Sequence, residues 1–206
     1  SLGKSYTYTY TGAVSFPIAS ITLSDGRVFH YETFTNAAGL EDLRVSSVDL
    51  SGKTLAISYQ DASSRRIAQV TESTGTVLTY ENYSDASGNI LGQRVASEHR
   101  QPAGELLEYR YEGSDPAALT SILRADGRIF SYESTVQAGA RIYRLSRIQS
   151  QTGITSYAYD PSNFTMLQSI TTPDGISFGL DSENRVISIS KAGENTREYF
   201  YQGTSL

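Results

Sequence analysis

The chain has 206 residues, a formal net charge of -5 and a pI near 5.1. This acidic balance argues against a nucleic-acid-binding surface and against an anchor to anionic membranes. The chain contains no cysteine, which excludes disulfides, thiolate zinc sites and a cysteine nucleophile. No apolar run approaches the roughly 18 residues that a membrane-spanning helix needs.

The composition favours a sheet with one wet face over a thick two-sided core. Apolar residues make up 38% of the chain, while Ser and Thr together make up about a quarter. Fifteen tyrosines and no tryptophan agree with this interpretation, because a tyrosine tolerates a half-buried position with its hydroxyl in water.

One turn pattern recurs from the start of the chain to its end. Apolar residues precede a glycine, and aromatic or apolar residues follow it, most clearly over Ile18 to Glu32, Leu119 to Glu133 and Leu167 to Asp181. In chain order the glycines are Gly26, Gly52, Gly75, Gly104, Gly127, Gly153, Gly175 and Gly193. Their spacing of roughly 24 residues predicts a repeat architecture in which each glycine, often after aspartate, forms a hairpin tip.

The residues after each glycine predict one apolar and aromatic face. The third and fifth positions are apolar or aromatic in most copies, and residues two apart point to the same side of a strand. The copies at Gly153 and Gly193 fit after a shift of one residue, for which we expect a bulge. The tyrosines at the fifth position are Tyr31, Tyr80, Tyr109 and Tyr132. They are the candidate ligand-binding residues, because exposed aromatic rings can stack on sugars, although we favour the interpretation that they stabilise the sheet through cross-strand aromatic pairs.

No long segment has a helical period, so we expect an all-β fold. The predicted architecture is a repetitive antiparallel β-hairpin array, curled or spiralling, of about eight hairpins in a single domain over residues 1–206. Because the sequence begins at Ser1, we expect a piece of a longer protein. Tyr6–Tyr10 and 199–202 resemble strands cut from further repeats, and we expect these edges to pair with flanking repeats, with each other or with another copy.

The search for chemistry predicts no catalytic residue, no metal site and no cofactor. His30 and His99 are about 70 residues apart, and no Gly-x-Ser-x-Gly elbow accompanies the serines. The recurring acids have structural explanations, as turn aspartates or as solvated glutamates that discourage edge-to-edge aggregation. They are Asp25, Asp126, Asp174, Glu32, Glu81, Glu112 and Glu133. For Arg141, Arg144 and Arg147 we expect solvated or tyrosine-stacked side chains.

A second element gives the repeat a family resemblance. The segment 109–112 reads Y-R-Y-E before one clear copy, and 157–160 reads Y-A-Y-D before another. The order Y-x-Y-[DE], L-x-S-I and D-G-x-x-[FY] resembles the YD repeat of the Rhs family, which includes bacterial Rhs toxins, the shell-forming subunits of Tc toxins and animal teneurins. The resemblance runs from about Tyr6 to residue 202 and is diluted between Val45 and Ile90. It implies a sheet that spirals into a hollow shell around a toxic polypeptide, or an extracellular scaffold.

Two departures narrow what the resemblance implies. The family's end-of-shell segment, with its autoproteolytic aspartate, has no match here, and eight hairpins are too few for a large closed shell. We therefore expect a non-catalytic structural segment of a secreted or cell-surface bacterial protein, beside or around a toxin polypeptide. The alternatives are a carbohydrate-binding adhesion module that uses its tyrosine columns on a surface glycan, and a self-assembling extracellular fibre subunit.

Overall fold

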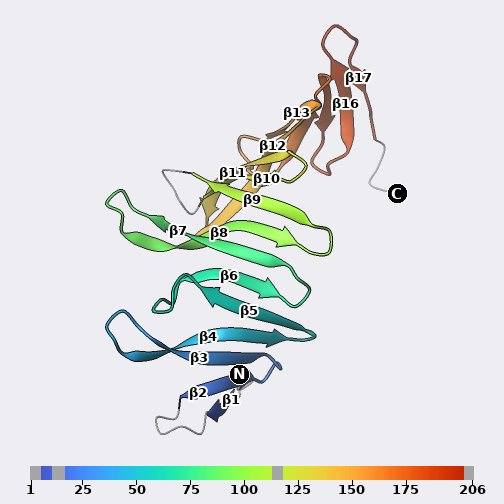
Figure 1. Cartoon of the computed structure of the whole chain (residues 1–206). Coiled ribbons are helices and arrows are strands. Elements are labelled where there is room, and N and C mark those ends of the chain that lie inside the picture. The colour runs from blue at the N-terminus through green and yellow to red at the C-terminus, as the bar shows by residue number, and fades with distance from the viewer. Residues whose placement is uncertain (1–5, 11–16, 113–117, 202–206) are drawn as a thin grey trace. The chain divides into compact units, whose positions relative to one another are not determined.

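The computed structural model describes residues 6–10, 17–112 and 118–201, and these residues form strands and turns without a helix (Figure 1). The first nine strands are β1 Tyr6–Tyr10, β2 Ile18–Leu23, β3 Val28–Thr35, β4 Glu41–Leu50, β5 Lys53–Tyr59, β6 Ile67–Glu72, β7 Val77–Ser84, β8 Ile90–Arg100 and β9 Glu105–Tyr111. The other eight are β10 Leu119–Arg124, β11 Ile129–Gln137, β12 Ala140–Ser150, β13 Gly153–Tyr159, β14 Leu167–Thr171, β15 Ile176–Leu180, β16 Val186–Lys191 and β17 Arg197–Glu198.

The strands form an antiparallel meander, in which each strand pairs with its neighbours in the sequence. Such pairings run from β1 through β8 and from β10 through β17. The chain divides into two units, Ser1–Leu107 and Glu108–Leu206. The all-β hairpin array that the sequence predicts is confirmed. The sheet in each unit is open and not strongly curled, and a single domain over residues 1–206 stays a prediction.

The hairpins alternate between two kinds along the chain. The A hairpins are β2–β3, β6–β7, β10–β11 and β14–β15, with tips at Gly26, Gly75, Gly127 and Gly175. The B hairpins are β4–β5, β8–β9, β12–β13 and β16–β17, with tips at Gly52, Gly104, Gly153 and Gly193. The true repeat is therefore one A and one B hairpin, about twice as long as the spacing of the glycines.

The tips of the A hairpins share one geometry. In the first, the amide of Leu23 donates to the carbonyl of Arg27, and the amide of Gly26 donates to the carbonyl of Leu23. The same two bonds recur at the other three A tips, and each glycine has a positive φ, as in a type I turn closed by a glycine bulge. All eight predicted glycines have a positive φ, so the sequence located the tips correctly.

The two faces of the sheet differ in chemistry. Cross-strand partners share a face, so the pairings define rows across each unit. One apolar row in the first unit contains Tyr8, Ile21, Phe29, Val48 and Leu55. A polar row in the second unit contains Ser121, Ser131, Arg147, Ser156, Thr171, Ser177 and Ser190. The structure thus has the wet face that the Ser and Thr content predicts.

The apolar face lacks a thick covering layer. Only Phe34, Leu107 and Ala118 are buried hydrophobic residues among those described. The chain exposes 13405 Å². Two separate compact proteins of half its mass would together expose about 11,400 Å². Most side chains of the sheet are therefore half-buried, and the usual hydrophobic core contributes little here.

Two expectations at the level of the repeat need correction. The pairing of β12 with β13 contains no bulge, because Ser150 pairs directly with Gly153. Gly153 is the first paired residue of β13, and its counterpart in β5 is Lys53, because Gly52 lies inside the turn before that strand. The glycine thus stands one position later in the hairpin at Gly153 than at Gly52, and this explains why the residues after it are shifted by one. At the end of the chain, β17 stops at Glu198, so Tyr199 and Tyr201 lie beyond the strand. Residue 202 lies outside the described residues.

Candidate functional site

A four-residue motif lies within the first strand of three B hairpins, and in the fourth it begins one residue before β16. The motif is an arginine, then Val or Leu, then any residue, then Ser or Arg. Its arginines are Arg44, Arg94, Arg144 and Arg185, of which the first three are spaced by fifty residues. The motif was not recognised in the sequence, although its spacing is a clear signal.

Arg44, Arg144 and Arg185 each contact a tyrosine, which stands at the end of the following strand or, for Arg185, three residues beyond it. The guanidinium carbon of Arg44 lies 4.1 Å from the ring centroid of Tyr59, and that of Arg144 lies 4.7 Å from Tyr159. Arg185 lies 4.8 Å from the ring of Tyr201. These are cation–π distances, so the stacked arginine expected from the sequence is confirmed at Arg144.

The tyrosine hydroxyl then binds the backbone beside the same arginine. Tyr159 donates to the carbonyl oxygen of Leu145 at 2.8 Å, and Tyr201 donates to that of Val186 at 2.7 Å. Tyr59 donates to the carbonyl of Val45 in the same way. We call this arrangement the Arg–Tyr clamp, formed by Arg44 with Tyr59, Arg144 with Tyr159 and Arg185 with Tyr201.

A carboxylate faces each clamp arginine from a neighbouring position. Glu32 lies 2.7 Å from Arg44, and Glu133 lies 2.6 Å from Arg144. Both pairs stand directly opposite each other across adjacent strands, as Glu81 and Arg94 also do. These glutamates were expected to be solvated acids that protect edges. Their side chains are 43% to 53% exposed, so they are solvated, but they lie on interior strands as ion-pair partners that help to position each guanidinium.

The guanidinium also holds the loop that follows the tyrosine. Arg44 Nη1 donates to the carbonyls of Asp61, Ala62 and Ser64, and Arg144 Nη1 donates to that of Phe164 at 3.1 Å. Since one planar cation contacts the ring, the acid and the loop, a lysine could not replace it.

The acid of the Tyr-Asp element has a local role. Asp160 Oδ1 accepts hydrogen bonds from the amide and hydroxyl of Ser162 and from the amide of Asn163. The hydroxyl and then the amide of Ser162 lower the pKa of the Asp160 carboxyl below its usual value. Asp61 makes the matching contacts with Ser63. The acid therefore caps its loop as an Asx turn and is not poised for catalysis.

Bulges lie beside the clamp tyrosines Tyr59 and Tyr159. Ser58 pairs with Gln69 but Tyr59 pairs with Ile67, so Ala68 is an extra residue in β6. The same shift lies between Ala158 and Tyr159. A bulge increases the local twist and re-aims the adjoining side chains, and its recurrence shows that it belongs to the repeat.

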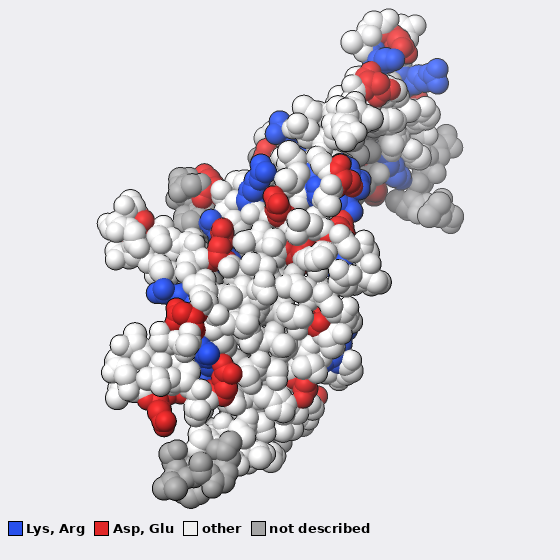
Figure 2. All heavy atoms as spheres, in the orientation of Figure 1, with Lys and Arg blue, Asp and Glu red and all other residues white. Residues whose placement is uncertain are grey.

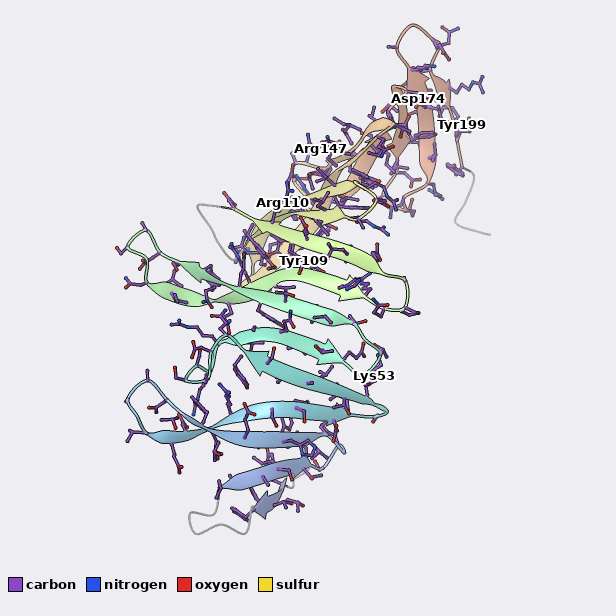
Figure 3. All side chains as sticks on the ribbon, in the orientation of Figure 1. Lys53, Tyr109, Arg110, Arg147, Asp174 and Tyr199 are labelled. Carbon is purple, nitrogen blue, oxygen red and sulfur yellow. The ribbon has the colours of Figure 1, made fainter. Side chains whose placement is uncertain are left out.

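The four predicted tyrosines do not form a continuous aromatic ladder. Tyr31, Tyr80 and Tyr132 are half-buried in A hairpins and face Val45, Val95 and Leu145. Burial raises the pKa of the Tyr132 phenol. Tyr109 is half-buried in β9 (Figure 3). In the first unit three strands, β4, β5 and β6, lie between the strand of Tyr31 and the strand of Tyr80. With neighbouring strands about 4.8 Å apart, the two tyrosines are separated by about 19 Å across the sheet. Their proposed ligand binding stays a prediction.

The described residues form no converging catalytic cluster. His30 lies 2.8 Å from Asp49 in a pair whose side chains are 41% and 43% exposed, and Thr54 donates to the same carboxylate. His99 contacts Gln101. No group of three or more possible metal ligands occurs in residues 6–10, 17–112 and 118–201.

The surface of the described chain is shallow and mixed in charge. Three of its hollows measure about 220, 260 and 400 Å³, and the one of 400 Å³ lies beside Tyr10 and Leu43. Figure 2 shows acidic and basic side chains as neighbours, with uncharged residues over the broad faces between them. Within the described ranges, no helix has the length and apolar character to cross a membrane.

Comparison with known proteins gives a structural similarity but no sequence match. No protein-family profile matches the chain, and no curated protein matches it. The chain is similar to part of TcdB2-TccC3-TEV, with a TM-score of 0.30, 13% identity and coverage of 94% of this chain and 12% of that chain. A Photorhabdus luminescens Tc holotoxin pore gives a TM-score of 0.27, 12% identity and coverage of 91% and 11%. The chain thus spans about an eighth of each matched chain.

Proposed function

We propose that this chain is a non-catalytic wall segment of a secreted or cell-surface bacterial protein with YD repeats. The observation that carries the proposal is the Arg–Tyr clamp, which recurs in register with the hairpins at Tyr59, Tyr159 and Tyr201. The arginine and the tyrosine of each clamp, and the carboxylate beside the arginine, have their partners within the sheet or its loops. The repeat therefore uses its polar chemistry to hold a thin sheet together.

A thin sheet needs such a device more than a globular domain does. With so few buried apolar side chains, stability has to come from many small contacts that recur along the array. Each clamp ties two strands and a loop together, and repeats can be added without changing it. This is the behaviour expected of a wall whose length is set by the number of repeats.

The proposal is tested on the native protein in its source cells. An antibody raised against the 206-residue chain would isolate the product from cell and culture-medium fractions for peptide mass spectrometry. We expect a longer polypeptide, in the medium or at the cell surface, with further YD repeats and a toxin sequence contiguous with this segment. A product of this size confined to the cytoplasm would contradict the proposal.

A further inference from the structure

Arg147 is an exposed cation on the polar face of the second unit. Ser121 pairs with Ser131 and Ser131 pairs with Arg147, so the three side chains lie on one face of β10, β11 and β12. On its other side, Arg147 pairs with Ser156 of β13. Within the described part of the chain, the guanidinium of Arg147 has no hydrogen bond, ion pair or aromatic contact, whereas Arg144, three residues earlier, has all three. The clamp therefore does not use Arg147.

Arg110 on β9 lies in the same row by the register of the repeat. β9 pairs with β10, and the amide of Glu112 donates to the carbonyl of Ala118 at 2.9 Å. The corresponding junctions, β5 with β6 and β13 with β14, have the same amide bond, and in both the residue two before the donor pairs with the residue three after the acceptor. Those pairs are Ser58 with Gln69 and Ala158 with Ser169. The same register places Arg110 opposite Ser121, so the row over β9 to β12 begins and ends with an arginine.

The two arginines belong to this row and not to the repeat. The same four places occur in three other sets of strands, β1 to β4, β5 to β8 and β13 to β16, and none of these rows holds an arginine or a lysine. In strand order the rows are Thr9, Ser20, His30 and Ser47, then Ser58, Gln69, Thr79 and Ser97, and then Ala158, Ser169, Gly179 and Ser188. Because the sheet forms elsewhere without these cations, the structure of the repeat does not explain Arg110 and Arg147.

The row has the spacing and the free donors of an anion site. Arg110 and Arg147 are both exposed (Figure 3), and three strand spacings, about 14 Å in all, separate their Cα atoms. Two arginine side chains that lean toward each other close most of this distance above Ser121 and Ser131. Like Arg147, Arg110 has no side-chain hydrogen bond or ion pair in the described residues, and neither serine hydroxyl has a hydrogen-bond partner there. Four donor groups without partners thus surround one place on the surface.

We propose that Arg110 and Arg147 bind a single phosphate or sulfate group between them, with the hydroxyls of Ser121 and Ser131 beneath it. Guanidinium groups bind the oxygens of such anions in pairs. Two guanidiniums and two hydroxyls match a tetrahedral anion with several oxygens, whereas a carboxylate, with two oxygens, is satisfied by one arginine. This site goes beyond the proposed wall function and stands or falls independently of it.

The charges around the row favour a small anion over a long one. Glu133 is bound by Arg144, and Glu112 lies in the loop after β9, so Glu108 is the carboxylate on the strand beside Arg110. It stands two residues before Arg110 and therefore on the same face, where it partly offsets the arginines. The chain as a whole carries a net charge of -5. Acids outside the row would repel a long polyanion, whereas one small group meets mainly the two arginines.

Titration of the natural chain with sodium phosphate, followed by NMR at constant ionic strength, tests the site. We expect saturable shifts of the Nε–Hε signals of Arg110 and Arg147 and of the amides of the two serines between them. Arg110→Ser and Arg147→Ser should each weaken binding about tenfold, because each removes charge-assisted contacts. Serine is the natural residue at the corresponding places, Ser58 and Ser97, so the fold accepts both variants.

Arg66→Ser is the matched control, because Arg66 is also exposed and has no ion pair within the described residues, but lies in the first unit. It should leave binding unchanged, and Glu108→Gln should strengthen binding by removing a nearby negative charge. Equal weakening by Arg66→Ser and Arg147→Ser would reduce the effect to net charge and overturn the proposal. So would the absence of saturable shifts, or binding that depends on only one of the two row arginines.

A free anion and an ester on a larger molecule present the same group to the site. Parallel titrations therefore use inorganic phosphate, inorganic sulfate, glucose with a phosphate ester, glucose with a sulfate ester, and glucose alone. Tighter binding of an ester than of its inorganic anion, without binding of glucose, supports a site for phosphorylated or sulfated sugars, and equal binding supports a site for the free anion. Acetate that binds as tightly as phosphate and sulfate would overturn the tetrahedral anion site. None of these results bears on whether the native protein is a secreted YD-repeat polypeptide, which the antibody experiment decides.

Discussion

The hydroxyl of Tyr159 donates a hydrogen bond of 2.8 Å to the carbonyl oxygen of Leu145, fourteen residues earlier in the chain. The residue before that carbonyl, Arg144, covers the ring of the same tyrosine. Tyr59 with Val45 and Tyr201 with Val186 repeat the relationship in other B hairpins. One polar device, used again along the chain, thus holds the sheet at Tyr59, Tyr159 and Tyr201.

Removing the hydroxyl should weaken the fold by the value of one hydrogen bond. Tyr159→Phe keeps the ring but leaves the carbonyl of Leu145 without this donor, so we expect a loss of about 1 kcal/mol in the free energy of unfolding. Urea denaturation measures it. Tyr157→Phe is the matched control, two residues earlier on the same face, and should change stability by less than half as much; equal losses would contradict the assignment.

Replacing the arginine should cost more than replacing the hydroxyl. Arg144→Lys keeps the charge but cannot contact Tyr159, Glu133 and Phe164 together, so we expect a loss of about 1–3 kcal/mol in urea denaturation. Arg27→Lys is the control, because Arg27 is about half exposed and pairs with Asp25 at a turn tip. If the two substitutions have equal effects, Arg144 is no more than a surface cation.

Acid should weaken the loops through their aspartates. The hydroxyl and amide of Ser162 lower the pKa of Asp160 in the folded state. The stabilisation is therefore present above the unfolded pKa and is lost as the pH falls through the lowered pKa of the folded state. We expect the urea midpoint to drop between pH 6 and pH 3, and the drop to be smaller in Asp160→Asn, whose amide oxygen still accepts but does not titrate in this range. An unchanged drop would exclude Asp160 as a contributor.

The A tips should require glycine because of their backbone. Gly127 has a φ of 81°, and a side chain there would meet no neighbouring atom within 4 Å. Gly127→Ala should therefore destabilise through backbone strain alone, by about 1 kcal/mol in thermal or urea unfolding. Gly127→Asn should cost less, because asparagine tolerates this conformation. Equal costs for the two variants would point to a cause other than φ.

The predicted glycan platform has its own test. A glycan-array screen of the natural chain should be repeated with Tyr80→Ala and Tyr132→Ala, with the fold checked by circular dichroism. Because valine and leucine, and no second aromatic ring, face Tyr80 and Tyr132 across the strands, we expect no binding that depends on these two tyrosines. Binding that both substitutions abolish while the fold persists would favour the adhesion module.

The sequence predicted the parts of this fold that depend on local chemistry. Gly26 and its seven counterparts marked the tips because a positive φ is a local requirement, and the alternation of apolar residues after them gave the strand faces. It did not reveal the pairing of two hairpin kinds or the clamps. The position of Tyr159 beside Leu145 depends on how β13 pairs with β12 and with β14, and on the bulge in the second of these pairings. An alternation of apolar and polar residues does not encode that register. The predicted tyrosines, such as Tyr80, follow the glycines most regularly, whereas the clamp tyrosines stand at the strand ends, beside the Tyr-Asp loops.

The most direct test of the clamp is a double-mutant cycle between Arg144→Met and Tyr159→Phe, read by urea denaturation. If ring, guanidinium and carbonyl form one unit, the double variant should lose less than the two single losses combined, with an interaction energy of at least about 0.5 kcal/mol. Strict additivity of the two losses would show that Arg144 and Tyr159 act independently, and would contradict the clamp as the device that holds the repeat.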